Sequence, residues 1–297
     1  MNSKTKTARL SILSNSSLII MKLIVGFLSG SVSIISEAIH SSMDLLAAVI
    51  AFFSVIISDK PADKDHPYGH GKVENISGVI EALLIFIASI IIIYKAVEKL
   101  INPSKIESVG LGFIVMFISA LVNYIVSRKL YKIAKQEESI ALEADALHLK
   151  ADVLTSFSVG LGLLLIYITK LNFLDPIVAI GVAVFILREA CELLKTAFQP
   201  LLDVKLSDVE ITKVRQAIEG HNMVYCNYHE LKTRRSGSKK YIDLHLVVPR
   251  DMSVEKAHHI CDDIENDIET SLKNSDVMIH VESCNKNCSC SECKVHA

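Results

Sequence analysis

Long apolar segments dominate the first two thirds of the chain, and each has the length of a membrane-spanning helix. A helix needs roughly 20 mostly apolar residues to cross the hydrocarbon core of a bilayer. The fifth segment is the least apolar, because ionisable residues crowd its first half, whereas Phe157–Ile168 is strongly apolar. The pattern predicts six transmembrane helices, at about residues 9–29, 32–58, 76–100, 108–130, 142–169 and 175–198.

The pattern changes near Leu206, where shorter segments replace the long apolar ones. Alternation of apolar and polar residues predicts half-buried strands, and a period near 3.6 predicts amphipathic helices. The Arg-Arg-Ser-Gly-Ser run at residues 234–238 is typical of a hairpin loop. These segments predict a small ferredoxin-like α+β domain of order αββαβ, with helices at Asp208–Glu219 and Val254–Leu272 and strands at Tyr228–Thr233, Tyr241–Val248 and Val277–Glu282.

Composition supports a division into a membrane part and a water-soluble part. The 297 residues are 51% apolar and 22% charged, and the charges are dense only after about Gln199. We therefore expect a six-helix membrane domain over residues 1–203, a soluble α+β domain over 204–283 and a Cys-rich tail over 284–297. The formal net charge of −2 argues against a nucleic-acid partner.

Basic residues indicate the orientation in the membrane. The first apolar segment is long and lacks a small-residue cleavage site, so it is expected to be a retained span. Six spans put both termini on one side, and the side richer in Lys and Arg is cytoplasmic by the positive-inside rule. Both termini and the soluble domain are therefore predicted to be cytoplasmic. The richer side carries Lys4, Lys6, Arg9, Lys60, Lys64, Lys72, Arg128, Lys129, Lys132 and Lys135, and the other side Lys95, Lys99, Lys105 and Lys170.

Two His–Asp pairs lie inside predicted spans. His40 and Asp44, and likewise His148 and Asp152, are four residues apart, which places each pair on one helix face. Ionisable groups inside a bilayer are costly and by default functional. Two imidazoles and two carboxylates form a tetrahedral donor set for a zinc-like ion, and protons could replace the metal when it leaves. The alternative is two local hydrogen bonds that only satisfy buried polar groups.

A second donor set lies between the second and third spans. Asp63, His66 and His70 are close in sequence, and Pro67 and Gly69 favour a shaped turn. Zinc accepts such ligands. The alternative is an exposed polar loop that happens to contain two histidines.

The soluble domain contains a third set. His229 and His245 lie on adjacent predicted strands, and His258 lies on the second helix. His280 and Glu282 are two apart on the last strand, so they share a face. We interpret the set as a zinc site, and the alternative is scattered surface histidines.

The tail has four cysteines and a histidine in 13 residues: Cys284, Cys288, Cys290, Cys293 and His296. Cysteine this dense in a cytoplasmic segment favours soft-metal binding, although the spacing matches no standard zinc finger. A redox-active tail and a terminal segment without a defined role are the alternatives.

From Ser11 to Glu282 the chain resembles the cation diffusion facilitator family. The resemblance is carried by the two i, i+4 pairs and by the motif Asp-x-x-His-Pro-Tyr-Gly-His-Gly-Lys-x-Glu from Asp63 to Glu74. It implies six spans, a cytoplasmic ferredoxin-like domain and a homodimer. It also implies three metal sites: a transport site at His40, Asp44, His148 and Asp152, a loop site at Asp63, His66 and His70, and a cytoplasmic site at His229, His245, His258, His280 and Glu282.

The resulting hypothesis is a homodimeric Zn²⁺/H⁺ antiporter of the plasma membrane that exports zinc from the cytoplasm, with Zn²⁺ also bound as a regulator. Many bacterial relatives have Asp at the position of His40, and imidazole in its place favours Zn²⁺ over Mn²⁺. The alternatives are a Mn²⁺, Fe²⁺ or Cd²⁺ exporter of the same fold and a membrane-anchored metal sensor that does not transport. An enzyme is disfavoured, because no nucleophile or phosphate-binding motif accompanies the histidines and Gly69–Lys72 lacks P-loop spacing.

Overall fold

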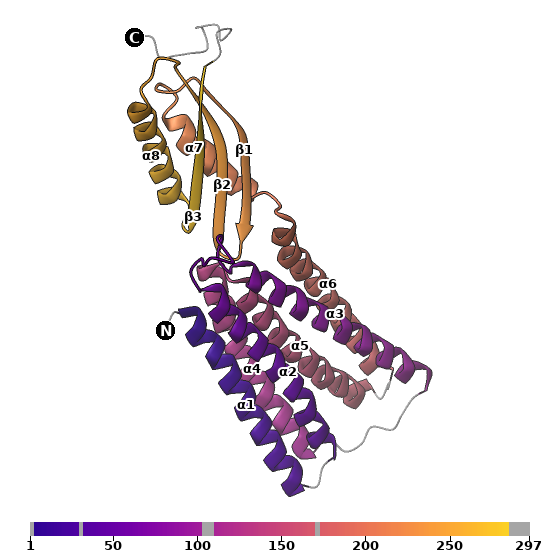
Figure 1. Cartoon of the computed structure of the whole chain (residues 1–297). Coiled ribbons are helices and arrows are strands. Elements are labelled where there is room, and N and C mark those ends of the chain that lie inside the picture. Colours follow the sequence, from indigo (N-terminus) through magenta and orange to yellow (C-terminus); the bar gives the residue numbers. More distant parts are fainter. Residues whose placement is uncertain (1–2, 30–31, 103–109, 170–172, 285–297) are drawn as a thin grey trace. The chain divides into compact units, whose positions relative to one another are not determined.

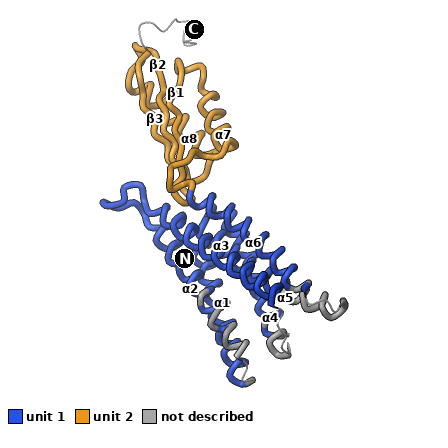
Figure 2. The backbone as a smooth tube through the Cα atoms, turned by 90° about the vertical axis from the view of Figure 1, so that its right-hand side faces the viewer, with its two compact units in different colours: residues 1–198 blue, residues 199–297 orange. Residues whose placement is uncertain are grey.

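The computed structural model describes residues 3–29, 32–102, 110–169 and 173–284, and within these ranges some side chains, including that of His40, lie outside the description. The chain forms two compact units, Met1–Phe198 and Gln199–Ala297 (Figure 2). Each unit is considered by itself below.

The first unit is a bundle of long helices that lie side by side (Figure 1). At 1.5 Å per residue, even the shortest, with 25 residues, exceeds the roughly 30 Å hydrocarbon thickness of a bilayer. The predicted polytopic α-helical membrane fold is confirmed. The helices are α1 (Ser3–Ser29), α2 (Val32–Ser58), α3 (Lys72–Ile101), α4 (Gly110–Glu137), α5 (Ile140–Thr169) and α6 (Leu174–Phe198).

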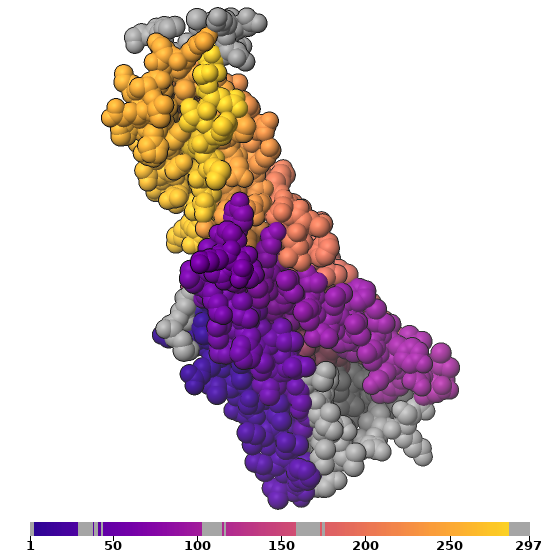
Figure 3. All heavy atoms as spheres, viewed as in Figure 1, coloured from indigo at the N-terminus to yellow at the C-terminus, as the bar shows by residue number. Residues whose placement is uncertain are grey.

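Large apolar side chains are exposed along the outer surface of the bundle, as expected of a surface that faces lipid. On α3, Ile87 and Ile91 are 53% and 47% exposed, whereas Ile85 and Ser89 are buried. Side chains of α2 and α3 cover one face of the bundle in Figure 3. By hydropathy and length alone, two stretches of the described residues qualify as spans, Ser3–Leu28 and Lys72–Ile101. The ionisable residues in the first half of α5 are a deviation from a purely apolar span that calls for a functional reason.

Close packing inside the bundle depends on small residues. At Gly78 of α3, an added Cβ would lie 2.6 Å from Cγ2 of Ile140 on α5 and 3.1 Å from Cβ of Ala197 on α6. A larger side chain would push these three helices apart. In membranes such small residues allow the close helix approach that packing between spans requires.

The second unit is a three-stranded sheet with its two long helices on one side (Figure 2). β1 pairs with β2 antiparallel, and β2 pairs with β3 parallel after a helical crossover. Both helices begin at a serine cap, and Ser207 forms a capping box with Glu210. The predicted order αββαβ is confirmed: η1 (Gln199–Leu202) leads into α7 (Asp208–Gly220), β1 (Asn227–Ser236), β2 (Lys239–Val248), α8 (Val254–Ser271) and β3 (Ser275–Ser283).

The alternation along β2 separates a core face from a second face of the sheet. Ile242, Leu244 and Leu246 are buried against residues of α7 and α8. His245 lies between two of these core residues, so its side chain emerges on the opposite face of the sheet. The helices therefore cover one face and leave the other for the histidine-containing set.

Candidate metal centres

The first candidate centre lies inside the bundle, where α2 and α5 meet. Asp44, His148 and Asp152 each present a ligand atom, and these atoms lie within 4.8 Å of one another. Nε2 of His148 is 3.1 Å from Oδ1 of Asp44, although 104 residues separate the two in sequence. Asp44 is only 6% exposed. A tetrahedral zinc ion with bonds of about 2.0–2.2 Å needs donors on the order of 3.5 Å apart, so small rotamer adjustments suffice to close this set around an ion.

His40, the fourth member of the predicted set, has a side chain outside the described part of the structure. Its backbone belongs to α2, one helical turn before Asp44. Its participation therefore remains a prediction from spacing.

Further acidic groups lie buried close to this centre. Asp145, one turn before His148 on α5, is fully buried and accepts a hydrogen bond of 3.1 Å from Ser11 of α1. Glu81 of α3 is 1% exposed and accepts a hydrogen bond of 3.2 Å from Ser77. Oδ2 of Asp145 and Oε2 of Glu81 have no hydrogen-bond partner among the described atoms. Residue-level reasoning did not single out Asp145, although a carboxylate within an apolar helix is itself the signal that identifies it.

The second candidate centre is the loop between α2 and α3. Oδ1 of Asp63 lies 3.1 Å from Nδ1 of His66, and Oδ2 of Asp63 lies 3.3 Å from Nε2 of His70. The predicted turn is present: Gly69 has φ +79°, a left-handed conformation that suits glycine. The backbone N–H of His66 donates to Asp63 and lowers the pKa of that carboxyl below its usual value. Asp63 is therefore ionised at neutral pH and available to a cation.

A buried ion pair anchors the helices that hold this loop. Lys4 of α1 donates to Glu74 of α3 at 3.2 Å, and the side chains are 6% and 1% exposed. Glu74 also accepts from Ser58 of α2 at 2.8 Å and from Ser139, the residue before α5, at 2.5 Å. One carboxylate thus connects four helices at the end of the bundle where the loop begins.

The third candidate centre lies on the helix-free face of the small sheet. His229 pairs across the sheet with His245, and His245 pairs with His280, so three imidazoles form a row across β1, β2 and β3. Oε1 of Glu282 is 2.8 Å from Nδ1 of His245, and Oε2 is 3.2 Å from Nε2 of His229. His229, His245 and Glu282 have donor atoms within 4.8 Å of one another.

The electrostatics of this face favour cation binding. Hydrogen bonds from His245 and His229 lower the pKa of Glu282, so its carboxyl is ionised at neutral pH. A bulge in β1 between His229 and Lys232 gives Glu230 a positive φ of 53°. Oε2 of Glu230 thereby comes within 4.0 Å of Nε2 of His245. The sequence pattern did not identify Glu230, because the bulge that aims it interrupts the regular alternation.

The structure does not bring His258 into this row within one chain. His258 lies on α8, which packs on the other face of the sheet, and its side chain is exposed with Asp262 as an ion-pair partner at 3.7 Å. In the tail, Cys284 is half-buried, whereas Cys288, Cys290, Cys293 and His296 lie outside the described residues. The roles of His258 and of the tail remain predictions.

A helical membrane bundle with a donor cluster in its interior, only partly exposed, followed by a small α+β domain with a second cluster, defines a transporter of metal cations. The chain belongs to the cation efflux family, also called the cation diffusion facilitator family. Residues 8–202 match the cation efflux transmembrane domain, and residues 206–284 match the cytoplasmic domain of cation efflux proteins. Members of this family are transporters, and the cytoplasmic domain is their dimerisation domain.

Two relatives of similar length agree with this assignment, and part of the chain is also similar to a solved structure. An uncharacterized transporter of Synechocystis sp., sll1263, is 33% identical over 255 residues, covering 86% of this chain and 82% of its own. The cation-efflux pump FieF of Salmonella agona is 28% identical over 269 residues, covering 91% of this chain and 89% of its own. A solved structure of the Zn form of CzrB shares 31% identity and covers 29% of this chain and 97% of its own, with a TM-score of 0.25.

Proposed function

We propose that this divalent cation transporter exports Zn²⁺ from the cytoplasm in exchange for protons. The observation that carries the proposal is the cluster of Asp44, His148 and Asp152 between two spans, in which Asp44 is buried and the other two are half-buried. Carboxylates buried in hydrocarbon cost several kcal/mol each unless they are neutralised or hold a cation. A bound metal ion or the protons that replace it would supply that compensation in alternating states.

Donor chemistry supports zinc as the cargo. The set combines imidazole nitrogen with carboxylate oxygen, a mixture that zinc accepts in tetrahedral geometry. Mn²⁺ prefers oxygen ligands in six-coordinate sites. His40 as fourth ligand would add a second imidazole and strengthen the preference for Zn²⁺ over Mn²⁺.

Proton coupling follows from the same groups. Imidazole and carboxylate bind metal only in their unprotonated forms, so metal and protons compete for one set of atoms. Sites of this kind in transporters lie near the bilayer midplane, and alternating access exposes them to each side in turn. We propose that protons displace zinc outside and that zinc displaces protons inside.

The direct test is zinc uptake into inverted membrane vesicles under an imposed pH gradient. We expect His148→Ala and Asp152→Ala each to abolish zinc flux driven by the pH gradient, because each removes one ligand of the shared ion. Glu98→Gln, which removes an exposed carboxylate of α3, is the matched control and should transport like the parent. Flux equal to the parent in both ligand variants would refute the mechanism.

Two alternatives are separated by the same vesicles. An exporter of Mn²⁺, Fe²⁺ or Cd²⁺ would show competition by those ions against zinc, and His40→Asp should broaden the range of ions. A membrane-anchored sensor would bind zinc saturably without any flux driven by the pH gradient. A donor set of Asp44, His148 and Asp152 inside the bundle favours transport, since a sensor needs no site within the membrane.

The cytoplasmic domain is proposed to sense zinc through His229, His245, His280 and Glu282, with His258 as a further ligand. Zinc bound there would stabilise one arrangement of the homodimer and so bias the transport cycle. We further propose that the protein resides in the plasma membrane with both termini in the cytoplasm, and that the functional division falls at residues 1–203, 204–283 and 284–297.

A further inference from the structure

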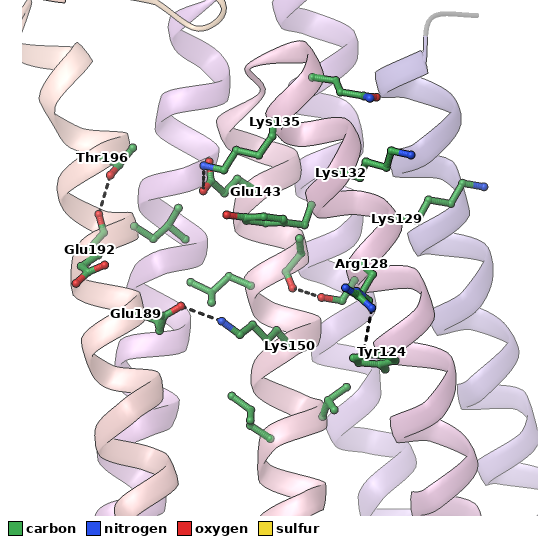
Figure 4. Close-up of a pocket in the computed structure, with 18 residues that line it drawn as sticks. Tyr124, Arg128, Lys129, Lys132, Lys135, Glu143, Lys150, Glu189, Glu192 and Thr196 are labelled. Atoms are coloured by element: carbon green, nitrogen blue, oxygen red, sulfur yellow. Dashed lines mark hydrogen bonds and ion pairs between the residues drawn. The ribbon is translucent and has the colours of Figure 1, made fainter. Parts of the chain in front are cut away.

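A groove of about 1350 Å³ lies on the bundle between α4, α5 and α6, apart from the candidate metal centres. Helix α5 lies between α4 and α6 in this lining, and the hydroxyl of Ser127 on α4 donates to the carbonyl of Ala146 on α5 at 2.8 Å. The metal donors of α5 are absent from its lining. The groove therefore has a chemistry of its own (Figure 4).

The walls combine an apolar part with a strongly basic part. The apolar lining comes from α5 and α6 and includes Leu147, Val153, Leu154 and Leu193. The basic residues that line it are Arg128, Lys129, Lys132, Lys135 and Lys150, against three carboxylates, Glu143, Glu189 and Glu192. Cations thus outnumber acids in a cavity whose lining is partly apolar.

Each of the three carboxylates in the groove forms an ion pair with a cation other than Arg128, Lys129 and Lys132. Lys135 pairs with Glu143 at 2.6 Å, and Lys150 pairs with Glu189 at 3.0 Å. Glu192 pairs at 3.3 Å with Arg188, which does not line the groove. Figure 4 shows the Lys150–Glu189 and Lys135–Glu143 pairs between the helices.

Three cations of α4 remain without an acidic partner among the described residues: Arg128, Lys129 and Lys132, all exposed. Arg128 donates to the hydroxyl of Tyr124 at 3.1 Å and lies 5.6 Å over that ring, so its neighbour is neutral. The three lie within five consecutive residues of α4, so their positive charges repel one another, and an anion bound beside them would relieve that repulsion.

We propose that the groove binds an anionic phospholipid. Its phosphate would lie at Arg128, Lys129 and Lys132, and an acyl chain would lie along Leu147, Val153 and Leu154. These cations belong to the basic end of α4, which the proposed topology places at the cytoplasmic headgroups, where anionic lipids attract basic side chains. An apolar slot continuous with a cationic rim matches a lipid better than a free phosphate, which would leave the slot unused.

The test is lipid retention by the purified full-length protein, measured by native mass spectrometry during titration with phosphatidylglycerol or phosphatidylcholine. We expect the parent to favour phosphatidylglycerol. The affinity of the triple variant R128Q/K129Q/K132Q for phosphatidylglycerol should be about 100-fold lower, because each cation is expected to contribute roughly fivefold. The matched control K6Q/R9Q/K60Q removes three exposed cations of the same predicted side elsewhere on the bundle and should retain the preference.

A second variant tests the apolar part without changing charge. Val153→Trp would fill the slot and should weaken retention of phosphatidylglycerol, while the melting temperature of the protein stays near that of the parent. Equal affinity for the two lipids, or an equal loss in the control triple, would overturn the proposal. The proposal would also be overturned if the parent retained no lipid and R128Q/K129Q/K132Q changed the oligomeric state. The groove would then be a contact between copies of the chain. None of these readouts depends on zinc transport, so the proposed function stands or falls separately.

Discussion

At the scale of single residues, the donor atoms differ in which protons they release when metal binds. Asp63 in the loop between α2 and α3 has a lowered pKa because the backbone N–H of His66 donates to its carboxylate. It is therefore already ionised between pH 5 and pH 8. The carboxyl of Asp63 therefore releases no proton when a cation binds, and any proton released at that centre comes from its two imidazoles, His66 and His70, because a metal ion binds the unprotonated ring.

The affinity of the loop centre for zinc should therefore fall as the pH is lowered, with a slope set by the release of two protons. Where both imidazoles are protonated, the affinity should fall by roughly 100-fold per pH unit of acidification, because each ring must release a proton before the metal binds. The measurement is calorimetric titration of the full-length protein carrying Asp152→Ala and His245→Ala, which remove the other centres. A slope of three protons would contradict this assignment, because the carboxyl would then titrate as well.

Two variants of the loop, measured by the same calorimetric titration, test whether the carboxylate of Asp63 binds the ion. Asp63→Asn should weaken zinc binding at neutral pH, because it removes the carboxylate that lies within 3.3 Å of the His70 ring. Asp65→Asn removes another exposed carboxylate two residues away and should leave the affinity unchanged. Equal effects of the two substitutions would indicate a general charge effect of the loop rather than a metal site.

At the scale of helices, the carboxylate of Glu74 holds four elements together through Lys4, Ser58 and Ser139. Removing one partner of a buried ion pair leaves the other charge poorly compensated. Glu74→Gln should lower the free energy of unfolding by about 3 kcal/mol, the lower part of the usual range, because Lys4 keeps Asp59 at 3.5 Å. Unfolding of the purified protein in a denaturing detergent, followed by helical circular dichroism, measures the change.

Glu98→Gln, at an exposed position of the same helix, provides the comparison. An exposed substitution of this kind normally changes stability by no more than about 0.5 kcal/mol. If the two variants unfold at the same detergent fraction, the Glu74 network does not contribute to holding the helices together.

Sequence reasoning predicted the helices well and the polar network poorly, and the reason is physical. Helix α2 spans Val32–Ser58, the range that hydropathy predicts, because a long apolar run fixes a helix locally. The spacing of His148 and Asp152 on one helix face was also predictable, since it depends only on helical geometry. The contact between Ser11 and Asp145 joins residues 134 apart, and the Lys4–Glu74 pair joins residues 70 apart. Such contacts depend on how helices pack, which periodicity does not specify.

In the small domain, the row of histidines was predictable from the sequence, whereas the residues around it were not. Strand alternation predicted that His280 and Glu282 share a face, and the cross-strand register brings His245 beside them. The bulge at Glu230 and the placement of α8, which keeps His258 on the other face, depend on tertiary packing. For these positions a pattern indicates the residue type and the element but not the contact.

At the scale of the whole molecule, two kinds of metal centre with different tasks should respond differently to substitution. The centre in the bundle is proposed to carry the ion, so losing it removes flux at every zinc concentration. The centre on the sheet, where Glu282 accepts from His229 and His245, is proposed to sense zinc and so to set the concentration at which transport begins. His245→Ala should therefore preserve the maximal zinc flux and raise the half-saturating zinc concentration by about tenfold, a coupling of ordinary size.

Proteoliposomes with zinc titrated on the face of the cytoplasmic domain measure both quantities at once. Asp152→Ala in the same preparation should abolish the maximal flux. His259→Ala changes an exposed histidine of α8 outside the proposed zinc ligands and should reproduce the parent curve. A curve for His245→Ala that coincides with the parent would leave the sheet centre without a regulatory task. A loss of maximal flux in that variant would instead mean that the cytoplasmic domain takes part in every transport cycle, because a pure sensor shifts the population of states and leaves the saturated rate unchanged.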